Sequence, residues 1–383
     1  MLPTRPDLDP KTLTQIVTWG GLVLGLALGA VGQATRFCVR GAIADWIVFR
    51  GPARFVSWML AVAVGSVLVQ ALISAGALDA SRTIFWGDRF VWASYLVGGL
   101  LFGYGMILAG GCPQRCLVKA GSGNLKAFVT LVVVAIAASM TLRGAFAGLR
   151  VNLLDAFAVP LAGSQDFGGL ASRVFGLPAT AVRWTISGVL ALAVFAFAWR
   201  VRRALDPAHW IGGIGVGLLV GAAFYLTGAL GFLPEHPETL EPAWLGTQSH
   251  RPEGLSFSAP MGHTLDLLTL WSDRGTVATF GVTLALGVLL GSFVSAKLRG
   301  EFRVESFKTP QDLRSHALGG LLMGFGGVTA LGCSVGNGVT GLAMLSAGSL
   351  LAVAGISIGA WLALAWQARQ QDVAAGAGLA AAR

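Results

Sequence analysis

Four cysteines are the residues of this chain best suited to chemistry: Cys38, Cys112, Cys116 and Cys333. Two of them complete a Gly-Cys pair inside an apolar stretch, in "LAGGCPQRCL" (108–117) and in "TALGCSVGNGV" (329–339). A buried cysteine is commonly just a small apolar side chain. Irregular, glycine-rich backbone at membrane depth, however, is tolerated only where protein or water surrounds it. The interruptions therefore predict a functional site rather than packing alone.

Three kinds of chemistry fit these thiols. A zinc site would need four nitrogen or sulfur ligands, but all five histidines lie outside the motifs (His209, His236, His250, His263 and His316). Pro113 also interrupts the pair formed by Cys112 and Cys116. A redox relay would need two facing thiols, such as Cys112 and Cys333. The interpretation that we favour is that thiols, as weak and polarizable ligands, line the path of a soft sulfur-bearing anion and pass it on.

Basic residues stand beside the same motifs. Arg36 and Arg40 flank Cys38, and Arg115 and Lys119 follow Cys112. Such cations attract an anion to the mouth of a path, although long basic side chains also mark the level of the lipid headgroups. We expect Arg36 and Arg115 to contact the anion.

The glycines of the motifs have a backbone role. Gly110, Gly111 and Gly332 permit tight turns and a close approach of the chain to the anion path, and Gly111 and Gly332 directly precede cysteines. Short helices that begin at these turns would point free N–H groups at the anion. We therefore include Gly111 and Gly332 among the expected binding residues.

The elements that carry these motifs are predicted to be membrane helices. The chain has 55% hydrophobic and 12% charged residues, and its apolar runs reach the length of about 20 residues that spans a bilayer. Polar Gly- and Cys-rich pieces after the first, third and eighth runs predict short re-entrant helices. We predict an all-α polytopic membrane protein with about nine spans: Val17–Ala34, Phe55–Gly76, Val91–Gly110, Leu125–Leu142, Val182–Trp199, Ile211–Phe232, Val277–Leu298, Ala317–Leu331 and Leu350–Trp366.

The two halves of the chain resemble each other. "GGLLFGYGMILAGGC" (98–112) and "GGLLMGFGGVTALGC" (319–333) agree at nine of fifteen positions without a gap. We predict one integral membrane domain (1–383) made of repeat one (15–142), a linker span (143–205) and repeat two (206–370). Five crossings separate corresponding elements, so repeat two would be inverted, an hourglass-like arrangement that forms a site near the midplane from both halves.

The charge pattern predicts an orientation. The net charge of +9 resides in short clusters between apolar runs, as in cytoplasmic loops of membrane proteins, so we expect no nucleic-acid partner. "WRVRR" (199–203) and the basic residues between the seventh and eighth spans lie on the expected cytoplasmic side. The acidic segment "PEHPETLEP" (234–242) lies on the other. The N-terminus is then outside and the C-terminus inside.

The motifs as a set resemble one known family. "RFCVRGAIAD", "AGGCPQRCLVKAGSGNL" and "ALGCSVGNGVTGL" are similar to the YeeE/YedE sulfur-transport family over nearly the whole chain. The resemblance implies a bacterial inner-membrane, multi-pass uptake protein for thiosulfate, in which Cys38, Cys112 and Cys333 contact the anion in turn. It assigns no role to Cys116. Arg115 stands where the family has a glycine, so the resemblance leaves the choice of sulfur or selenium anion open.

We therefore predict a permease for a small sulfur-containing anion, thiosulfate above all, and not an enzyme. The chain has no nucleotide-binding, Walker or haem-attachment motif, and we expect no cofactor and no metal. A cytoplasmic sulfur-carrier protein is a candidate partner besides the anion and the lipid bilayer. The alternative is a membrane thiol-redox or sulfur-transfer enzyme that uses Cys112 and Cys333. The sequence does not choose between channel-like and ion-coupled transport, nor does it fix the oligomeric state.

Overall fold

The computed structural model describes residues 9–237, 239–273 and 275–381. The long helices are α1 (Pro10–Thr35), α3 (Pro52–Ser74), α4 (Trp92–Leu108), α6 (Leu125–Leu142), α9 (Ala179–Arg200), α10 (Pro207–Phe224), α12 (Phe280–Leu298), α13 (Pro310–Thr329) and α14 (Ala347–Ala381). The predicted single domain also includes residues 1–8 and 382–383, which lie outside the described part.

Shorter elements connect these helices. The α-helices among them are α2 (Val39–Val48), α5 (Pro113–Gly121), α7 (Ala145–Leu149), α8 (Phe167–Phe175) and α11 (Ser258–Thr269). Single turns of 3₁₀-helix are η1 (Ala80–Arg82), η2 (Ile84–Trp86) and η4 (Arg202–Ala204), and π-helical turns are η3 (Arg150–Leu154), η5 (Tyr225–Leu230) and η6 (Gly336–Gly341). Two antiparallel pairs of two-residue strands join β1 (Arg89–Phe90) to β2 (Val159–Pro160) and β3 (Phe232–Leu233) to β4 (Ala243–Trp244).

Eight helices in the described part are long and apolar enough to cross a membrane. The chain is therefore a multi-pass, all-α membrane protein, as predicted. The eighth predicted span, Ala317–Leu331, lies largely in α13, which is helical but is not among the eight helices that meet this criterion. Its first two turns carry Gln311, Asp312, Arg314, Ser315 and His316, and these polar residues lower the mean hydropathy of the helix.

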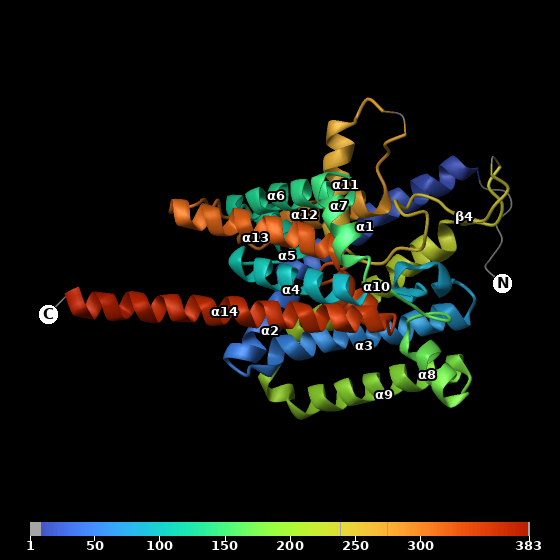
Figure 1. Cartoon of the computed structure of the whole chain (residues 1–383), viewed down its shortest axis with the longest axis horizontal. Helices are drawn as coiled ribbons and strands as arrows, with labels where there is room; N and C mark the ends of the chain where they lie inside the picture. Colours follow the sequence, from blue (N-terminus) through green and yellow to red (C-terminus); the bar gives the residue numbers. More distant parts are fainter. Residues whose placement is uncertain (1–8, 238, 274, 382–383) are drawn as a thin grey trace.

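The long helices lie roughly side by side (Figure 1). The start of α1, β4 and α11 lie toward one end of the bundle, and the start of α13 and the far end of α14 lie toward the other. The predicted linker span is α9, which packs on α3 and α8 and leaves most of its surface exposed. The predicted polar interruptions are the short helices α2 and α5 and the π-turn η6, which confirms that the chain is broken at these three places.

The main helix pairs cross between the first and second halves of the chain. Helix α1 packs on α12 and α3 packs on α10, while α4 packs on α14 and on α13, and α6 packs on α13. Each pair joins an element before residue 143 to an element after residue 205. The interior between the helices is thus built from both halves.

Glycines allow the closest of these crossings. A Cβ atom on Gly25 of α1 would lie 2.8 Å from the Cα of Gly287 in α12, which is closer than side chains approach backbone. On α4, a Cβ on Gly103 would collide with the main-chain oxygen of Ile356 in α14. Small residues at membrane-helix interfaces permit this backbone contact, so the two halves meet with little side-chain material between them.

A buried ion pair fastens the loop that precedes α9. The Asp166 carboxylate is fully buried and accepts hydrogen bonds from Arg183 Nε (2.8 Å) and Nη2 (3.1 Å), and the guanidinium lies 4.0 Å from the ring centre of Trp86. Burial alone would raise the pKa of Asp166. The hydrogen bonds from Arg183, Ser164 and the Gly169 amide outweigh that effect and hold the pKa below its usual value. The ionised pair therefore stabilises the fold at neutral pH.

Candidate functional site

The three motif cysteines occupy the same place in three separate helix breaks. Helices α1, α4 and α13 end at a residue in the left-handed conformation: Arg36 (φ 56°), Gly110 (φ 66°) and Leu331 (φ 56°). A cysteine follows two residues later in each case, and a short helical segment, α2, α5 or η6, follows the cysteine. The left-handed residue stops one helix and the cysteine begins the next, so each thiol is held at a bend rather than on a helix face.

The thiols form a connected group. Cys112 and Cys333 are fully buried, whereas Cys38 is half-buried. The Cys112 thiol has both Cys38 and Cys333 among its electrostatic neighbours. The structure therefore brings together the three cysteines that the sequence analysis selected.

Two of the thiols accept a hydrogen bond from the backbone of their own short helix. The Gly41 amide donates to Cys38 Sγ and the Gly336 amide donates to Cys333 Sγ, both at 3.3 Å. The expected free N–H groups at these helix starts are thus used by sulfur. Because sulfur accepts these bonds, the S–H hydrogens of Cys38 and Cys333 remain available to donate to an anion.

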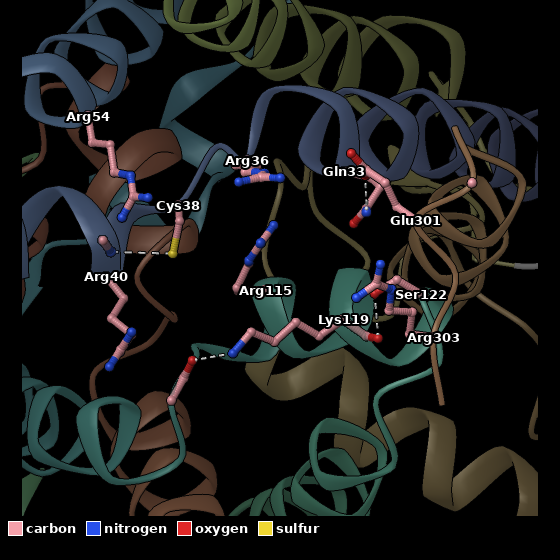
Figure 2. Close-up of a pocket in the computed structure, with 13 residues that line it drawn as sticks. Gln33, Arg36, Cys38, Arg40, Arg54, Arg115, Lys119, Ser122, Glu301 and Arg303 are labelled. Atoms are coloured by element: carbon pink, nitrogen blue, oxygen red, sulfur yellow. Dashed lines mark hydrogen bonds between the residues drawn. The ribbon is translucent and has the colours of Figure 1, made fainter. Parts of the chain in front are cut away.

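A basic basin opens beside Cys38. It has a volume of about 610 Å³ and lies at the junction of α1, α2, α5 and the end of α12. Figure 2 shows the cationic side chains gathered around this space together with the Cys38 thiol. Six cations and one carboxylate, that of Glu301, line it; the cations are Arg36, Arg40, Arg54, Arg115, Lys119 and Arg303. The basin is therefore a strong attractor for anions.

Few of these cations are neutralised. Among the described residues, the only ion pair that a basin cation forms is the 3.3 Å contact of Arg54 with Asp45. Arg115 donates to the Gly32 carbonyl (3.2 Å), and Lys119 donates to the Gly110 carbonyl (2.8 Å). These bonds to neutral carbonyls orient the side chains and leave their positive charge uncompensated. Lys119 thereby also ties α5 to the turn before Cys112.

A second cavity, the loop-side cavity, lies near Cys333. It has a volume of about 350 Å³, and its lining includes Gly332 and Ser256. The Ser256 side chain faces the Cys333 thiol, so this cavity approaches the third cysteine as the basic basin approaches the first.

The charges of the loop-side cavity are largely balanced. Arg143 pairs with Asp266 at 3.7 Å, and Arg150 pairs with Asp155 at 3.6 Å. Glu253 accepts hydrogen bonds from the Ser249 amide (2.9 Å) and hydroxyl (2.7 Å). Burial nevertheless raises the pKa of Glu253 above its usual value. This mouth does not present the excess of positive charge found in the basic basin.

The two cavities lie at opposite ends of the helix bundle. Thr279 and Gly281, at the start of α12, line the loop-side cavity, and Gly300 and Glu301, just after its end, line the basic basin. The 19 residues of α12 span about 28 Å at the rise of an α-helix, close to the thickness of a hydrocarbon core. The three thiols thus lie between cavities separated by about one membrane thickness.

The remaining predicted residues have defined places. Arg36 and Arg115 line the basic basin. Gly111 is buried, and a Cβ there would lie 3.2 Å from Cys116 Sγ. The expected turn at Gly332 is wrong in one detail, because the left-handed residue is Leu331. Gly332 instead makes room for Asn337, whose Nδ2 donates to its carbonyl at 2.8 Å and would lie 3.0 Å from an added Cβ.

Several polar residues of the site were not predicted from the sequence. Gln114 and Ser334 are buried beside the cysteines, and Ser256 faces Cys333. Arg54 and Arg303 join the basic basin from distant parts of the chain. Gln114 and Ser334 follow Cys112 and Cys333 by two residues and one residue, so their polarity inside an apolar stretch was an available signal. Nothing near Arg54 or Arg303 in the sequence links them to a cysteine motif.

The described residues contain no group of three or more His, Cys, Asp or Glu side chains placed to hold a metal ion. All four cysteines are free thiols. Cys116 also has Cys38 as an electrostatic neighbour, but its S–H hydrogen is already used, because Sγ donates to the Gly111 carbonyl at 3.6 Å. The arrangement offers neutral S–H donors between two cavities, which suits binding and passage of an anion.

Comparison with known proteins gives one family and two relatives. The family model described as sulphur transport matches residues 34–362. A relative from Escherichia coli K12, named thiosulfate transporter TsuA, is 28% identical over 352 residues, which cover 90% of this chain and 92% of the relative. A relative of the same name from Spirochaeta thermophila is 27% identical over 354 residues, which cover 91% and 98%.

Proposed function

The chain belongs to the sulphur transport family, and from that premise we propose that it is a thiosulfate uptake permease. It is a transporter and not an enzyme. The observation that carries the proposal is the line of three thiols, Cys38, Cys112 and Cys333, between a basic basin and a second cavity at the opposite end of the bundle. Neutral thiols bind the terminal sulfur of thiosulfate as S–H donors. They do so more weakly than a buried cation would, so the anion can leave again.

The binding residues that we propose are Cys38, Cys112 and Cys333, with Arg36 and Arg115 at the basin and Gly111 and Gly332 as the backbone beside the thiols. The anion enters the loop-side cavity, meets Cys333 first, passes Cys112 and leaves past Cys38. The neighbours of the thiols support this order, because Ser256 of the loop-side cavity faces Cys333, Cys38 lines the basic basin, and Cys112 has both cysteines as electrostatic neighbours. A thiol-redox enzyme built on Cys112 and Cys333 is not favoured, since the family and both relatives are transporters.

The proposed architecture is an inverted repeat of residues 15–142 and 206–370, joined by residues 143–205. The helix pairs support it, because α1 on α12 is matched by α10 on α3, and α4 on α14 is matched by α13 on α6. Exchange of the two repeats converts each of these pairs into its counterpart. The site at the centre then receives Cys38 and Cys112 from one repeat and Cys333 from the other.

We place the protein in a bacterial inner membrane with the basic basin inside. The basic basin and the clusters at 199–203 and 297–314 lie at the same end of the bundle, since they follow the ends of α1, α9 and α12. Positive charge concentrates on cytoplasmic loops. The basin, at about 610 Å³, lies in the range that accommodates ligands larger than one small anion. A cytoplasmic sulfur-carrier protein that docks there is our candidate for the recipient of the anion.

Uptake of labelled thiosulfate into liposomes that contain the purified protein tests the function. Thiosulfate should enter faster than into empty liposomes, unlabelled thiosulfate should compete strongly, and sulfate, sulfite and selenite should compete weakly. Equal transport of sulfate and thiosulfate would contradict the role of the thiols, because sulfate has no terminal sulfur to accept from them.

A further inference from the structure

Four of the thirteen buried side-chain polar atoms that lack a hydrogen-bond partner in the described part belong to residues that closely follow the three motif cysteines. In the described part of the chain, both side-chain polar atoms of Gln114, the hydroxyl of Ser334 and Nε of Arg40 are buried without a hydrogen-bond partner. Each belongs to a residue one or two positions after Cys112, Cys333 or Cys38, respectively. Native proteins leave few such atoms unpaired, and each one calls for an explanation such as a ligand.

Three polar side chains that follow Cys333 do have partners, whereas Thr329, which precedes it, also has an unpaired hydroxyl. Thr340 donates to the Leu255 carbonyl at 2.9 Å, and Ser349 donates to Asn337 Oδ1 at 3.0 Å. Asn337 in turn donates to the carbonyls of Ala330 and Gly332. These bonds hold the turn around Cys333 rigidly. Ser334 is fully buried within this ordered turn, and its hydroxyl has no nitrogen or oxygen partner and faces the Cys112 thiol.

The unused groups lie where the two motifs meet. The Ser334 side chain approaches the Cys112 thiol, although the two residues come from different halves of the chain. Gln114 is the second residue of α5, which Cys112 caps; it is only 1% exposed, and its Nε2 lies 3.2 Å from the position of a Cβ added to Gly32 in α1. The Ser334 hydroxyl thus faces the Cys112 thiol, and the buried Gln114 amide lies on the first turn of the helix that Cys112 caps, both closed to bulk water.

These donors differ in what they bind well. A thiol is soft and polarizable and suits sulfur, whereas hydroxyl and amide N–H groups are the usual donors to oxygen. Thiosulfate has both kinds of acceptor, one terminal sulfur and three oxygens on the central sulfur.

We propose that Ser334 and Gln114 form an oxygen-binding subsite that holds the three-oxygen end of the anion while the cysteines hold its terminal sulfur. The proposal deepens the proposed function and rests on it. The subsite distinguishes thiosulfate from hydrosulfide, which has no oxygen to bind there. The cysteines distinguish it from sulfite, which has no terminal sulfur, so subsite and thiols together select an anion that carries both.

The test compares Ser334→Ala with Cys112→Ala in liposomes, with labelled thiosulfate as the transported ion and hydrosulfide or sulfite as competitors. Ser334→Ala should raise the half-saturating thiosulfate concentration about tenfold, weaken the already weak competition by sulfite further and leave the competition by hydrosulfide unchanged. Cys112→Ala should lose competition by hydrosulfide instead. Gln114→Leu should behave as Ser334→Ala does.

The matched control is Ser66→Ala, because Ser66 is equally buried but bonds to Ser187 away from the motifs. It should leave the competition pattern unchanged. If Ser334→Ala does not fold, Ser334→Thr keeps the hydroxyl and Ser334→Cys replaces it by a thiol; only the threonine variant should keep the wild-type pattern. An unchanged thiosulfate affinity and competition pattern in folded Ser334→Ala and Gln114→Leu would overturn the subsite. Failure of the wild-type protein to transport thiosulfate would overturn the proposed function itself.

Discussion

Replacement of Cys112 by alanine is the most direct probe of the thiol path. Cys112 is fully buried and has Cys38 and Cys333 as neighbours, so an anion beside it has no water to replace a lost S–H donor. Alanine removes the donor, while serine keeps a donor that is harder and less polarizable. Uptake should therefore fall most in Cys112→Ala and less in Cys112→Ser.

The size of the effect follows from the burial of this thiol. A hydrogen bond to a charged group contributes about 1.5–3 kcal/mol, and about 1.36 kcal/mol in the barrier corresponds to tenfold in rate. With no water within reach, most of that contribution is lost from the barrier state in which the anion passes Cys112. We expect uptake to fall between about tenfold and about 150-fold.

The control is Cys116→Ala, because Cys116 is 1% exposed and lies one helical turn away in α5. Each substitution removes one buried sulfur atom from the same region, so the two should lower the melting temperature to a similar extent. Initial rates of labelled thiosulfate uptake should separate them, with Cys116→Ala near wild type. Full uptake by folded Cys112→Ala would refute the thiol path. Equal inactivity of the alanine and serine variants, combined with dependence on added reductant, would instead indicate redox chemistry.

Three further predictions concern topology, stability and packing. Arg303→Cys, at the basic basin, and Arg251→Cys, near the loop-side cavity, should react with an impermeant maleimide from the inner and outer faces respectively in a background with Cys38 replaced; reaction of both from one face would exclude opposite mouths. The pKa of Asp166 is lowered in the folded protein, so its contribution to stability is present above the usual aspartate pKa and is lost as pH falls through the lowered value. Asp166→Asn should lower the free energy of unfolding by about 3–5 kcal/mol, because it leaves Arg183 unpaired. It should also reduce the fall of the melting temperature with falling pH, and an unshifted melting temperature at neutral pH would contradict this. Gly103→Val should abolish folding or assembly, measured by gel filtration in detergent, because its side chain would enter the backbone of α14; a normal elution profile would show that the crossing can open.

The helices were predictable because hydropathy marks them directly. The predicted span Leu125–Leu142 coincides with α6 residue for residue, and the Gly-Cys interruptions coincide with helix breaks. The polar start of α13 escaped the prediction, since Asp312 and Lys126 satisfy each other across two helices at 2.6 Å. Such a pairing depends on tertiary contacts that no local pattern reveals.

The candidate site was predictable only where its residues belong to a recognisable local sequence motif. The three cysteines carry that signal through repeated motifs. Leu331 escaped, because a leucine in the left-handed conformation contradicts the backbone preference of its residue type, and the turn around Asn337 holds it there. Arg303 was not predicted either. It reaches the basin only because the chain after α12 packs against the end of α5, where the Arg303 amide donates to the Ser122 carbonyl.

The basic basin also affects the electrical work of transport. A dianion that enters a cell held at 100 mV, negative inside, climbs about 4.6 kcal/mol, twice the value for one charge. In the proposed orientation, the cations of the basin make the local potential at the inner mouth more positive than that of the cytoplasm. Thiosulfate bound in the basin therefore has a lower electrostatic energy than thiosulfate in the cytoplasm. They do not change the total climb to the cell interior. If the path is not coupled to an ion gradient, thiosulfate enters only as fast as the cell consumes it at the basin, and the metabolism of the cell then sets the direction of flow.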